Sequence, residues 1–221
     1  MMTKKQIISF LKQSHLFGEV ADKGLETISE YVKENTYDRS GIIFSEGDKG
    51  DTLHIIVKGS VKITKYTKEG RTKTLAVLKE KDGFGEMALL TEEARSATVE
   101  SLEKTITLSI TKEKFEFLIK KEPSISLQII KTLCHRLARA DRDIKNLALG
   151  DAKTRVACVL VDFKGEAEEI KLTHQEIADM AGLTRETTTR TLKQMANDGA
   201  IETRNRKINI KDMIKLKDFC N

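Results

Sequence analysis

The middle of the chain carries an apolar repeat that only one long helix can satisfy. Pro123 suits a first helical turn and the next glycine is Gly150, so we predict a helix from about Ser124 to Leu149. Along it, apolar residues step by three, four, three, four and three positions: Ile130, Leu133, Leu137, Ala140, Ile144 and Leu147. This heptad spacing predicts the seam of a two-helix dimer. The alternative is that the helix packs only on its own β domain.

The chain before this helix changes from helical to strand periodicity. Residues from about 4 to 33 place apolar side chains three and four positions apart, which predicts helices. Residues from about 36 to 111 form short β-branched runs, such as TLHIIVKG and SVKITKYT, punctuated by glycines. Many short strands with glycine turns predict a β-barrel, sandwich or jelly roll.

Positive charge is concentrated after the long helix. The formal net charge of the chain is +5, and residues 182–211 hold seven basic residues against three acidic ones. Nearly all of the excess therefore lies in thirty residues. Charge gathered in one segment is what the neutralisation of nucleic-acid phosphates requires.

The same region has the start and stop signals of two short helices. Thr173 and Glu176 have the spacing of a capping box, and Gly182 can take the positive φ of a tight turn. Thr184 is a second N-cap, so another helix begins after a turn of about three residues. Two helices joined in this way predict a helix-turn-helix, in which the second helix enters the major groove.

On a helical wheel the second helix has two distinct faces. The apolar face holds Thr188, Thr191, Leu192 and Met195, and the opposite face holds Arg185, Glu186, Thr189, Arg190 and Lys193. Arginine can bond guanine twice, and glutamate can accept from cytosine. The alternative is an ordinary solvated helix face.

A basic β-ribbon is predicted directly after this helix. AIETRNRKINI reads as two strands around a turn at Asn205 and Arg206. Arg206 and Lys207 would then contact phosphates beside the second helix.

The segment FGEMALLTEEARSATVE, residues 84–100, combines groups suited to a sugar phosphate. Gly85 permits close backbone approach, and the turn that includes Met87 and Ala88 offers free N–H groups. Glu86 can accept from a ribose hydroxyl. Arg95 offers a planar fork to a phosphate, and Ser96 adds a hydroxyl and a backbone N–H before Ala97. The alternative is that Glu86 and Arg95 form an ion pair with each other and bind nothing.

These motifs together resemble the CRP/FNR family of bacterial transcription regulators. Arg185, Glu186 and Arg190 match the recognition helix of its cAMP-receptor-like members, and residues 84–99 resemble its phosphate-binding cassette. The resemblance implies an α+β fold: a cyclic-nucleotide-binding β-roll (1–119), a dimerisation helix (120–149) and a winged helix-turn-helix domain (150–221). It also implies a homodimer on a palindromic TGTGA-like site, a hinge near Gly150, and RNA polymerase as a partner.

The resemblance also points to Ala140 and Asp141 as effector-binding positions. Aligned on Asn146, they stand where cAMP-receptor-like members offer Thr and Ser to adenine. An ionised aspartate only accepts hydrogen bonds, which suits guanine somewhat better than adenine. We expect a cyclic purine nucleotide, with cAMP first and cGMP or another guanine cyclic nucleotide next. The alternative is that Asp141 pairs with an arginine of its own helix, either Arg136, Arg139 or Arg142.

Other functions find less support in the sequence. Its four histidines lie in no catalytic or metal-binding pattern, so we expect no enzyme and no metal, and His54 is expected to be a hydrogen-bonded strand residue. The first of three cysteines is Cys134, which argues against the N-terminal iron–sulfur cluster of oxygen-sensing family members and against haem. Three cysteines so far apart make disulfides unlikely, and we expect a cytoplasmic protein without membrane contact. A constitutive DNA binder, a different effector, or a signalling module without DNA binding stay open.

Overall fold

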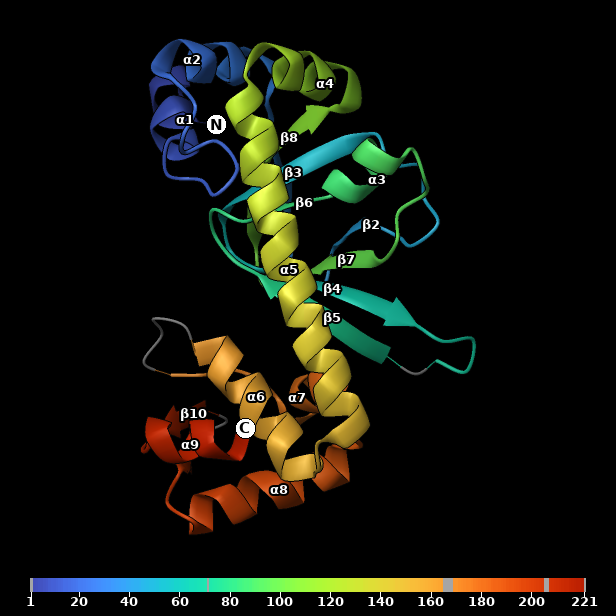
Figure 1. The fold of residues 1–221 in the computed structure, drawn as a ribbon, viewed down its shortest axis with the longest axis vertical. Coiled ribbons are helices and arrows are strands. Elements are labelled where there is room, and N and C mark those ends of the chain that lie inside the picture. Colours follow the sequence, from blue (N-terminus) through green and yellow to red (C-terminus); the bar gives the residue numbers. More distant parts are fainter. Residues whose placement is uncertain (1, 71, 165–168, 205–206, 221) are drawn as a thin grey trace. The chain divides into compact units, whose positions relative to one another are not determined.

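The computed structural model describes residues 2–70, 72–164, 169–204 and 207–220 (Figure 1). The chain divides into two compact units: residues 1–65 with 75–137, and residues 66–74 with 138–221. Helix α5 (Pro123–Leu149) contributes residues to both units. The three functional domains expected from the sequence stay a prediction.

The first unit is built around two four-stranded sheets, ordered β1-β8-β3-β6 and β2-β7-β4-β5. Strand β3 pairs antiparallel with both β8 and β6, and β7 pairs antiparallel with both β2 and β4. The strands are β1 (Lys33–Tyr37), β2 (Ile42–Phe44), β3 (Thr52–Lys58), β4 (Val61–Tyr66), β5 (Thr72–Leu78), β6 (Gly83–Phe84), β7 (Thr98–Ser101) and β8 (Thr105–Thr111). The α+β fold with a β-roll is therefore confirmed.

Strand β3 shows how the period of two positions the core. Ile56 is fully buried between the sheets with Phe84, Val61, Leu78 and Val99. Its neighbour Ile55 points the other way, because successive strand side chains alternate between faces. Ile55 packs in a second cluster with residues of five helices (Figure 1): α1 (Lys4–Leu11), α2 (Asp22–Tyr31), α3 (Glu86–Thr91), α4 (Lys112–Lys121) and the first turns of α5.

Helix α5 is buried at its start and exposed along its seam. Ile125 and Ile129 belong to the core of the first unit. Of the predicted seam residues, Leu133 packs partly against that core. The other five are exposed: Ile130, Leu137, Ala140, Ile144 and Leu147. Packing on its own β domain thus accounts only for the first turns of the helix.

The second unit is a helical domain with one small β-ribbon. Its elements are α6 (Ala152–Lys164), α7 (His174–Ala181), α8 (Arg185–Asn197), β9 (Ile201–Arg204), β10 (Lys207–Ile210) and α9 (Met213–Cys220). Val156, Leu160, Leu192, Met195 and Leu216 are at most 1% exposed and form its core. The helix-turn-helix and the ribbon were expected, whereas α4 and α9 were not.

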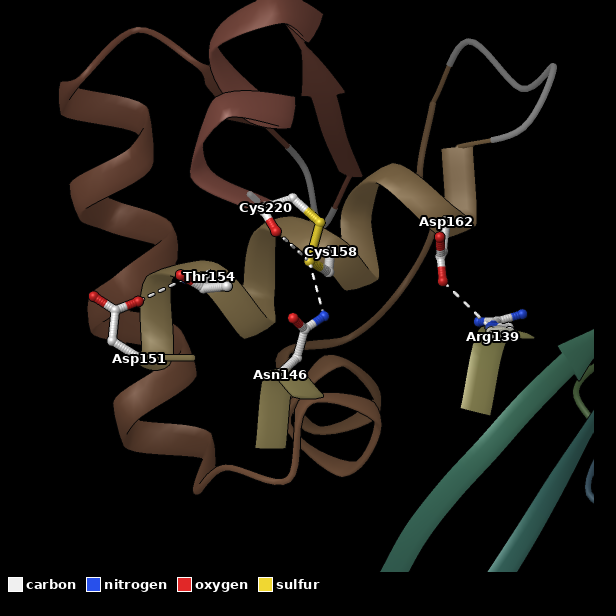
Figure 2. Close-up of a disulfide and its surroundings, with 7 residues drawn as sticks. All are labelled: Arg139, Asn146, Asp151, Thr154, Cys158, Asp162 and Cys220. Atoms are coloured by element: carbon white, nitrogen blue, oxygen red, sulfur yellow. Dashed lines mark hydrogen bonds and ion pairs between the residues drawn. A yellow bond between two sulfur atoms is a disulfide. The ribbon is translucent and has the colours of Figure 1, made fainter. Parts of the chain in front are cut away.

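The expectation of no disulfide is wrong, because Cys158 and Cys220 are bonded (Figure 2). They lie 62 positions apart in the sequence, but α6 and α9 pack against each other through Leu160 and Leu216. The Cα atoms of the two cysteines are therefore only 5.0 Å apart, within the usual range for a disulfide. Cys134 is free and exposed.

The described ranges contain neither a candidate membrane span nor a candidate metal cluster. No helix there is both long enough and apolar enough to cross a membrane. Nor does that part of the chain bring three or more His, Cys, Asp or Glu side chains together around a possible metal position.

Candidate functional sites

The predicted phosphate cassette begins at a glycine that the backbone requires. Gly85 has φ +88° and caps helix α3 (Glu86–Thr91). A Cβ at this position would lie 2.7 Å from Nη1 of Arg95 and 2.9 Å from the carbonyl oxygen of Thr52. Gly85 therefore supplies both the left-handed turn and the room for Arg95 beneath it.

Glu86 is a buried carboxylate whose partner comes from α5. Glu86 is 4% exposed, and its Oε1 lies 2.5 Å from Nη1 of Arg136. The other guanidinium nitrogen of Arg136 donates to the carbonyl oxygen of Gly83 at 2.5 Å. The alternative in which Glu86 pairs with Arg95 is therefore wrong, since the carboxylate is neutralised by Arg136.

Arg95 is also buried, at 4% exposed, but it is held by neutral groups. Nη1 donates to the carbonyl of Gly85 at 2.9 Å, and Nη2 donates to the carbonyl and hydroxyl of Thr52 at 2.7 and 3.0 Å. The guanidinium carbon sits 4.0 Å above the ring of Phe44. Among the described residues Arg95 has no ion-pair partner within 4 Å, its Nε has no hydrogen-bond partner, and burial lowers the pKa of the guanidinium. The carboxylates of Asp51, Glu86 and Asp48 act on this cation only without direct contact, so it has room for an anion that bonds it directly.

His54 lies beside this arginine and is held neutral. Its ring stacks on Phe84 at 5.2 Å and lies 3.3 Å from the hydroxyls of both Thr52 and Thr107. Burial, and secondly the positive charge of Arg95, lower the pKa of His54 to about 4. The expectation of a hydrogen-bonded strand histidine is confirmed.

The remaining residues of the predicted cassette divide into exposed and buried ones. Met87 and Ser96 are exposed and adjacent, with the serine hydroxyl 3.9 Å from the methionine sulfur. Ala88 and Ala97 are buried at 4% and 5% exposed, so only their backbone could serve a ligand. The structure thus brings together Gly85, Glu86, Arg95, Met87 and Ser96.

Ala140 and Asp141 are exposed positions of α5 in the second unit. Two of the arginines that could have paired with Asp141 are committed elsewhere: Arg136 binds Glu86, and Arg139 binds Asp162 at 3.3 Å. Within the described ranges Asp141 makes no ion pair with Arg142 or with any other residue. The alternative of a paired Asp141 therefore does not hold.

The helix-turn-helix is built as the sequence predicts. Thr173 accepts from the backbone N–H of Glu176, whose carboxylate accepts from the N–H of Thr173 at 2.6 Å. Gly182 ends α7 with φ +65°, and the hydroxyl of Thr184 caps α8 by accepting from the N–H of Thr187. These local bonds set the angle at which α8 leaves the turn.

Helix α8 has the two faces expected of a recognition helix. Its buried side chains are Thr188, Thr191, Leu192 and Met195, and its exposed ones include Arg185, Glu186, Thr189, Arg190 and Lys193. In the described part of the chain none of these three cations has an ion-pair partner. Nδ1 of His174 lies 2.9 Å from the Thr189 hydroxyl, which donates to the carbonyl of Arg185 at 2.8 Å. The charged face is therefore free to contact a polyanion.

The ribbon that follows is partly committed to its own domain. Strands β9 and β10 pair antiparallel, with Lys207 opposite Arg204. Lys207 makes an ion pair with Glu169 at 2.6 Å, so a phosphate would have to compete for it. Arg206 and the turn predicted at Asn205 lie outside the described residues.

Several residues of the candidate effector site escaped sequence reasoning. Phe44 and Thr52 contact Arg95 from strands far along the chain, and no local pattern marks them. The sequence suggested Arg136 only as a possible partner of Asp141. Its role as the partner of Glu86 depends on how α5 packs on the sheet, which spacing along the sequence does not give.

Two family models match the parts of the chain that hold these candidate sites. The family model described as a cyclic nucleotide-binding domain matches residues 34–122, and the Crp-like helix-turn-helix domain matches residues 154–219. The "Cyclic AMP receptor protein" of Thermus thermophilus is 30% identical over 211 residues, covering 95% of this chain and 98% of that protein.

Two solved structures share the fold. FixK2 from Bradyrhizobium japonicum aligns with a TM-score of 0.78 at 21% identity, covering 86% of this chain and 98% of that one. The "c-di-GMP Responsive Global Regulator CLP" of Xanthomonas campestris aligns with a TM-score of 0.76 at 24% identity, covering 86% and 99%.

The Glu86–Arg136 pair yields a stability prediction. Arg136→Met leaves a buried carboxylate without a cation, so we expect the free energy of unfolding to fall by about 3 kcal/mol. Glu86→Gln combined with Arg136→Met should recover part of this loss. Urea unfolding of the full chain measures both, with Arg142→Met on the same helix as control. Equal losses for Arg136→Met and Arg142→Met would contradict the assignment.

His54 yields a pH prediction. Folding favours the neutral ring of His54. Its contribution to the free energy of unfolding is therefore complete above pH 6.5 and is lost as the pH falls from 6.5 to about 4. The difference between the unfolded pKa of 6.5 and the folded pKa of about 4 corresponds to about 3 kcal/mol of unfolding free energy. His54→Gln should flatten the fall of unfolding free energy in this window, and His135→Gln, at an exposed residue of α5, is the matched control. Identical pH profiles for wild type and His54→Gln would refute the assignment.

Proposed function

Because the chain belongs to the CRP/FNR family of transcription regulators, we propose that it is a homodimeric DNA-binding regulator controlled by a cyclic purine nucleotide. The DNA-binding and regulatory class follows from family membership. The effector, the palindromic site and the dimer are the proposed parts. We place the protein in the cytoplasm, where bacterial DNA and its further proposed partner, RNA polymerase, are found.

The observation that carries the effector proposal is the buried guanidinium of Arg95. It is desolvated and bonded only to neutral oxygens, so a cyclic phosphate would supply its missing counter-charge. The exposed hydroxyl of Ser96 adds a donor to the same phosphate. The buried carboxylate of Glu86 would accept from the ribose hydroxyl.

The base is proposed to meet Ala140 and Asp141, by resemblance to the cAMP-receptor-like members. Alanine offers no hydrogen bond, and the unpaired carboxylate of Asp141 can accept from a base. Cyclic AMP is the first candidate, because the Thermus relative is a cyclic AMP receptor protein. Guanine nucleotides come next, because a carboxylate suits their adjacent N–H donors.

The dimer is proposed to form along the exposed seam of α5. Large apolar side chains such as Leu137 and Ile144, each 64% exposed, recur at heptad spacing and would be covered by the same helix of a second copy. A two-fold dimer would present two α8 helices to two half-sites. A nucleotide then acts through its different affinity for two arrangements of the DNA-binding units.

Binding of a cyclic nucleotide is the first test. We expect isothermal titration of the purified chain with cAMP, cGMP and cyclic di-GMP to show binding of at least one. Ser96→Ala should weaken that affinity about tenfold, as expected for the loss of one bond to a charged group. Thr91→Ala, whose hydroxyl bonds the carbonyl of Met87 within α3, is the matched control. If none of the three nucleotides binds, the effector proposal is wrong and the alternative is a constitutive DNA binder. Gel shifts with and without nucleotide would identify such a protein.

Base readout by α8 is the second test. Arg185→Ala should cost about 1–3 kcal/mol on a TGTGA-type palindrome and much less on random DNA. Lys193→Ala should weaken both DNAs about equally, since a phosphate contact carries no sequence information. Lys217→Ala removes an exposed cation of α9 and serves as control. Fluorescence anisotropy measures all three, and equal losses on both DNAs for Arg185→Ala would rule out the groove assignment.

A further inference from the structure

The disulfide closes a loop around the DNA-binding elements. Cys158 lies in the middle of α6, and Cys220 is the last residue of α9. The 62-residue separation encloses both helices of the helix-turn-helix and the ribbon. A cross-link of this span restricts the unfolded state of the whole segment.

Cys158 also lies on the face of α6 that contacts the end of α5 (Figure 2). The side-chain amide of Asn146 in α5 is 3.2 Å from Sγ of Cys158. Three positions earlier, Arg155 donates to the carbonyl of Leu147 at 3.0 Å, and four positions later Asp162 pairs with Arg139 at 3.3 Å. One face of α6 therefore binds α5 at three points, and the sulfur is the middle one.

The helices do not need the covalent bond in order to pack. Val156, Leu160 and Leu216 are fully buried in the common core of α6 and α9. Lys153 of α6 lies 3.7 Å above the ring of Phe219, beside Cys220. With the thiols reduced, the two cysteines stay close together in the folded protein, and the bond can form or break without unfolding.

A protein that works on DNA operates where thiols are kept reduced, and disulfides that form there are usually transient or redox-sensing. We propose that Cys158 and Cys220 are a reversible thiol–disulfide site, oxidised by low-molecular-weight disulfides, whose oxidation stabilises the DNA-binding unit. Only the role of that unit rests on the proposed function.

The chemistry balances with one small disulfide. The thiolate of Cys158 attacks one sulfur of the small disulfide, which forms a mixed disulfide and releases one small thiolate. The thiolate of Cys220 then attacks Sγ of Cys158 and releases the second. Two electrons pass from the cysteine pair to the small disulfide, and the two cysteine protons end on the two released thiols. The amide of Asn146 favours the reactive thiolate by donating to it.

The test uses the full chain, reduced with dithiothreitol, desalted without air and incubated with oxidised glutathione. Mass spectrometry should show a loss of two hydrogens and a Cys158–Cys220 peptide link. Calorimetry should show a melting temperature roughly 10 °C or more higher than in the reduced form. Cys158→Ser and Cys158→Ala should abolish both changes, whereas Cys134→Ser, at the free exposed cysteine, should preserve them.

The proposal is wrong if oxidised glutathione gives glutathione adducts without the Cys158–Cys220 disulfide, or if that disulfide leaves the melting temperature unchanged. It is also wrong if dithiothreitol reduces the disulfide only after the protein is unfolded. DNA binding is measured separately by gel shift on both redox forms. Loss of DNA binding in both forms with the mass and melting changes intact would count against the proposed function alone. Normal DNA binding without those changes would count against the redox site alone.

Discussion

The buried carboxylate of Glu86 is the constraint on which the first unit depends. A carboxylate that is 4% exposed needs a cation, and Arg136 of α5 provides it at 2.5 Å while also holding the carbonyl of Gly83. The phosphate cassette and α5 are thereby tied by one buried ion pair.

Two arginines of the first unit, the partly exposed Arg136 and the buried Arg95, therefore have different electrostatic roles. Arg136 is neutralised by a carboxylate, whereas Arg95 is held by the oxygens of Gly85 and Thr52 and by the ring of Phe44. Burial first, and the charge of Arg95 second, lower the pKa of His54 and keep its ring neutral. A phosphate bound to Arg95 would change the electrostatic environment of this histidine, because the arginine is a cause of its low pKa.

The second unit is attached to α5 in a similarly specific way. The carbonyls at the end of α5 lack helical partners, and Arg155 of α6 donates to that of Leu147 and also to the carbonyl of Gly150, which follows the helix. Asn146 and Cys158 add a contact on the same face. The core of this unit then fixes α8, whose buried threonines and leucine leave its charged side chains exposed. The position of α8 thus depends both on the caps at Gly182 and Thr184 and on the core that α8 shares with α6.

Local patterns in the sequence determined most of the elements. The heptad steps predicted α5, the period of two predicted the strands, and the signals at Thr173, Gly182 and Thr184 predicted both helices of the helix-turn-helix. Each signal depends on neighbours within a few positions, which a single sequence displays. The helix α4 was missed because it lies directly between the strand pattern of β8 and the heptad pattern of α5, and α9 was missed because its eight residues are too few to show a heptad repeat.

Only the tertiary structure decided which distant groups meet. Glu86 pairs with Arg136, 50 positions away, and not with Arg95, nine positions away in the same cassette. Cys158 bonds Cys220 across the whole DNA-binding segment because α6 and α9 share one core. Spacing along a chain fixes which residues share a helix or strand face, but partners between elements follow from how those faces pack.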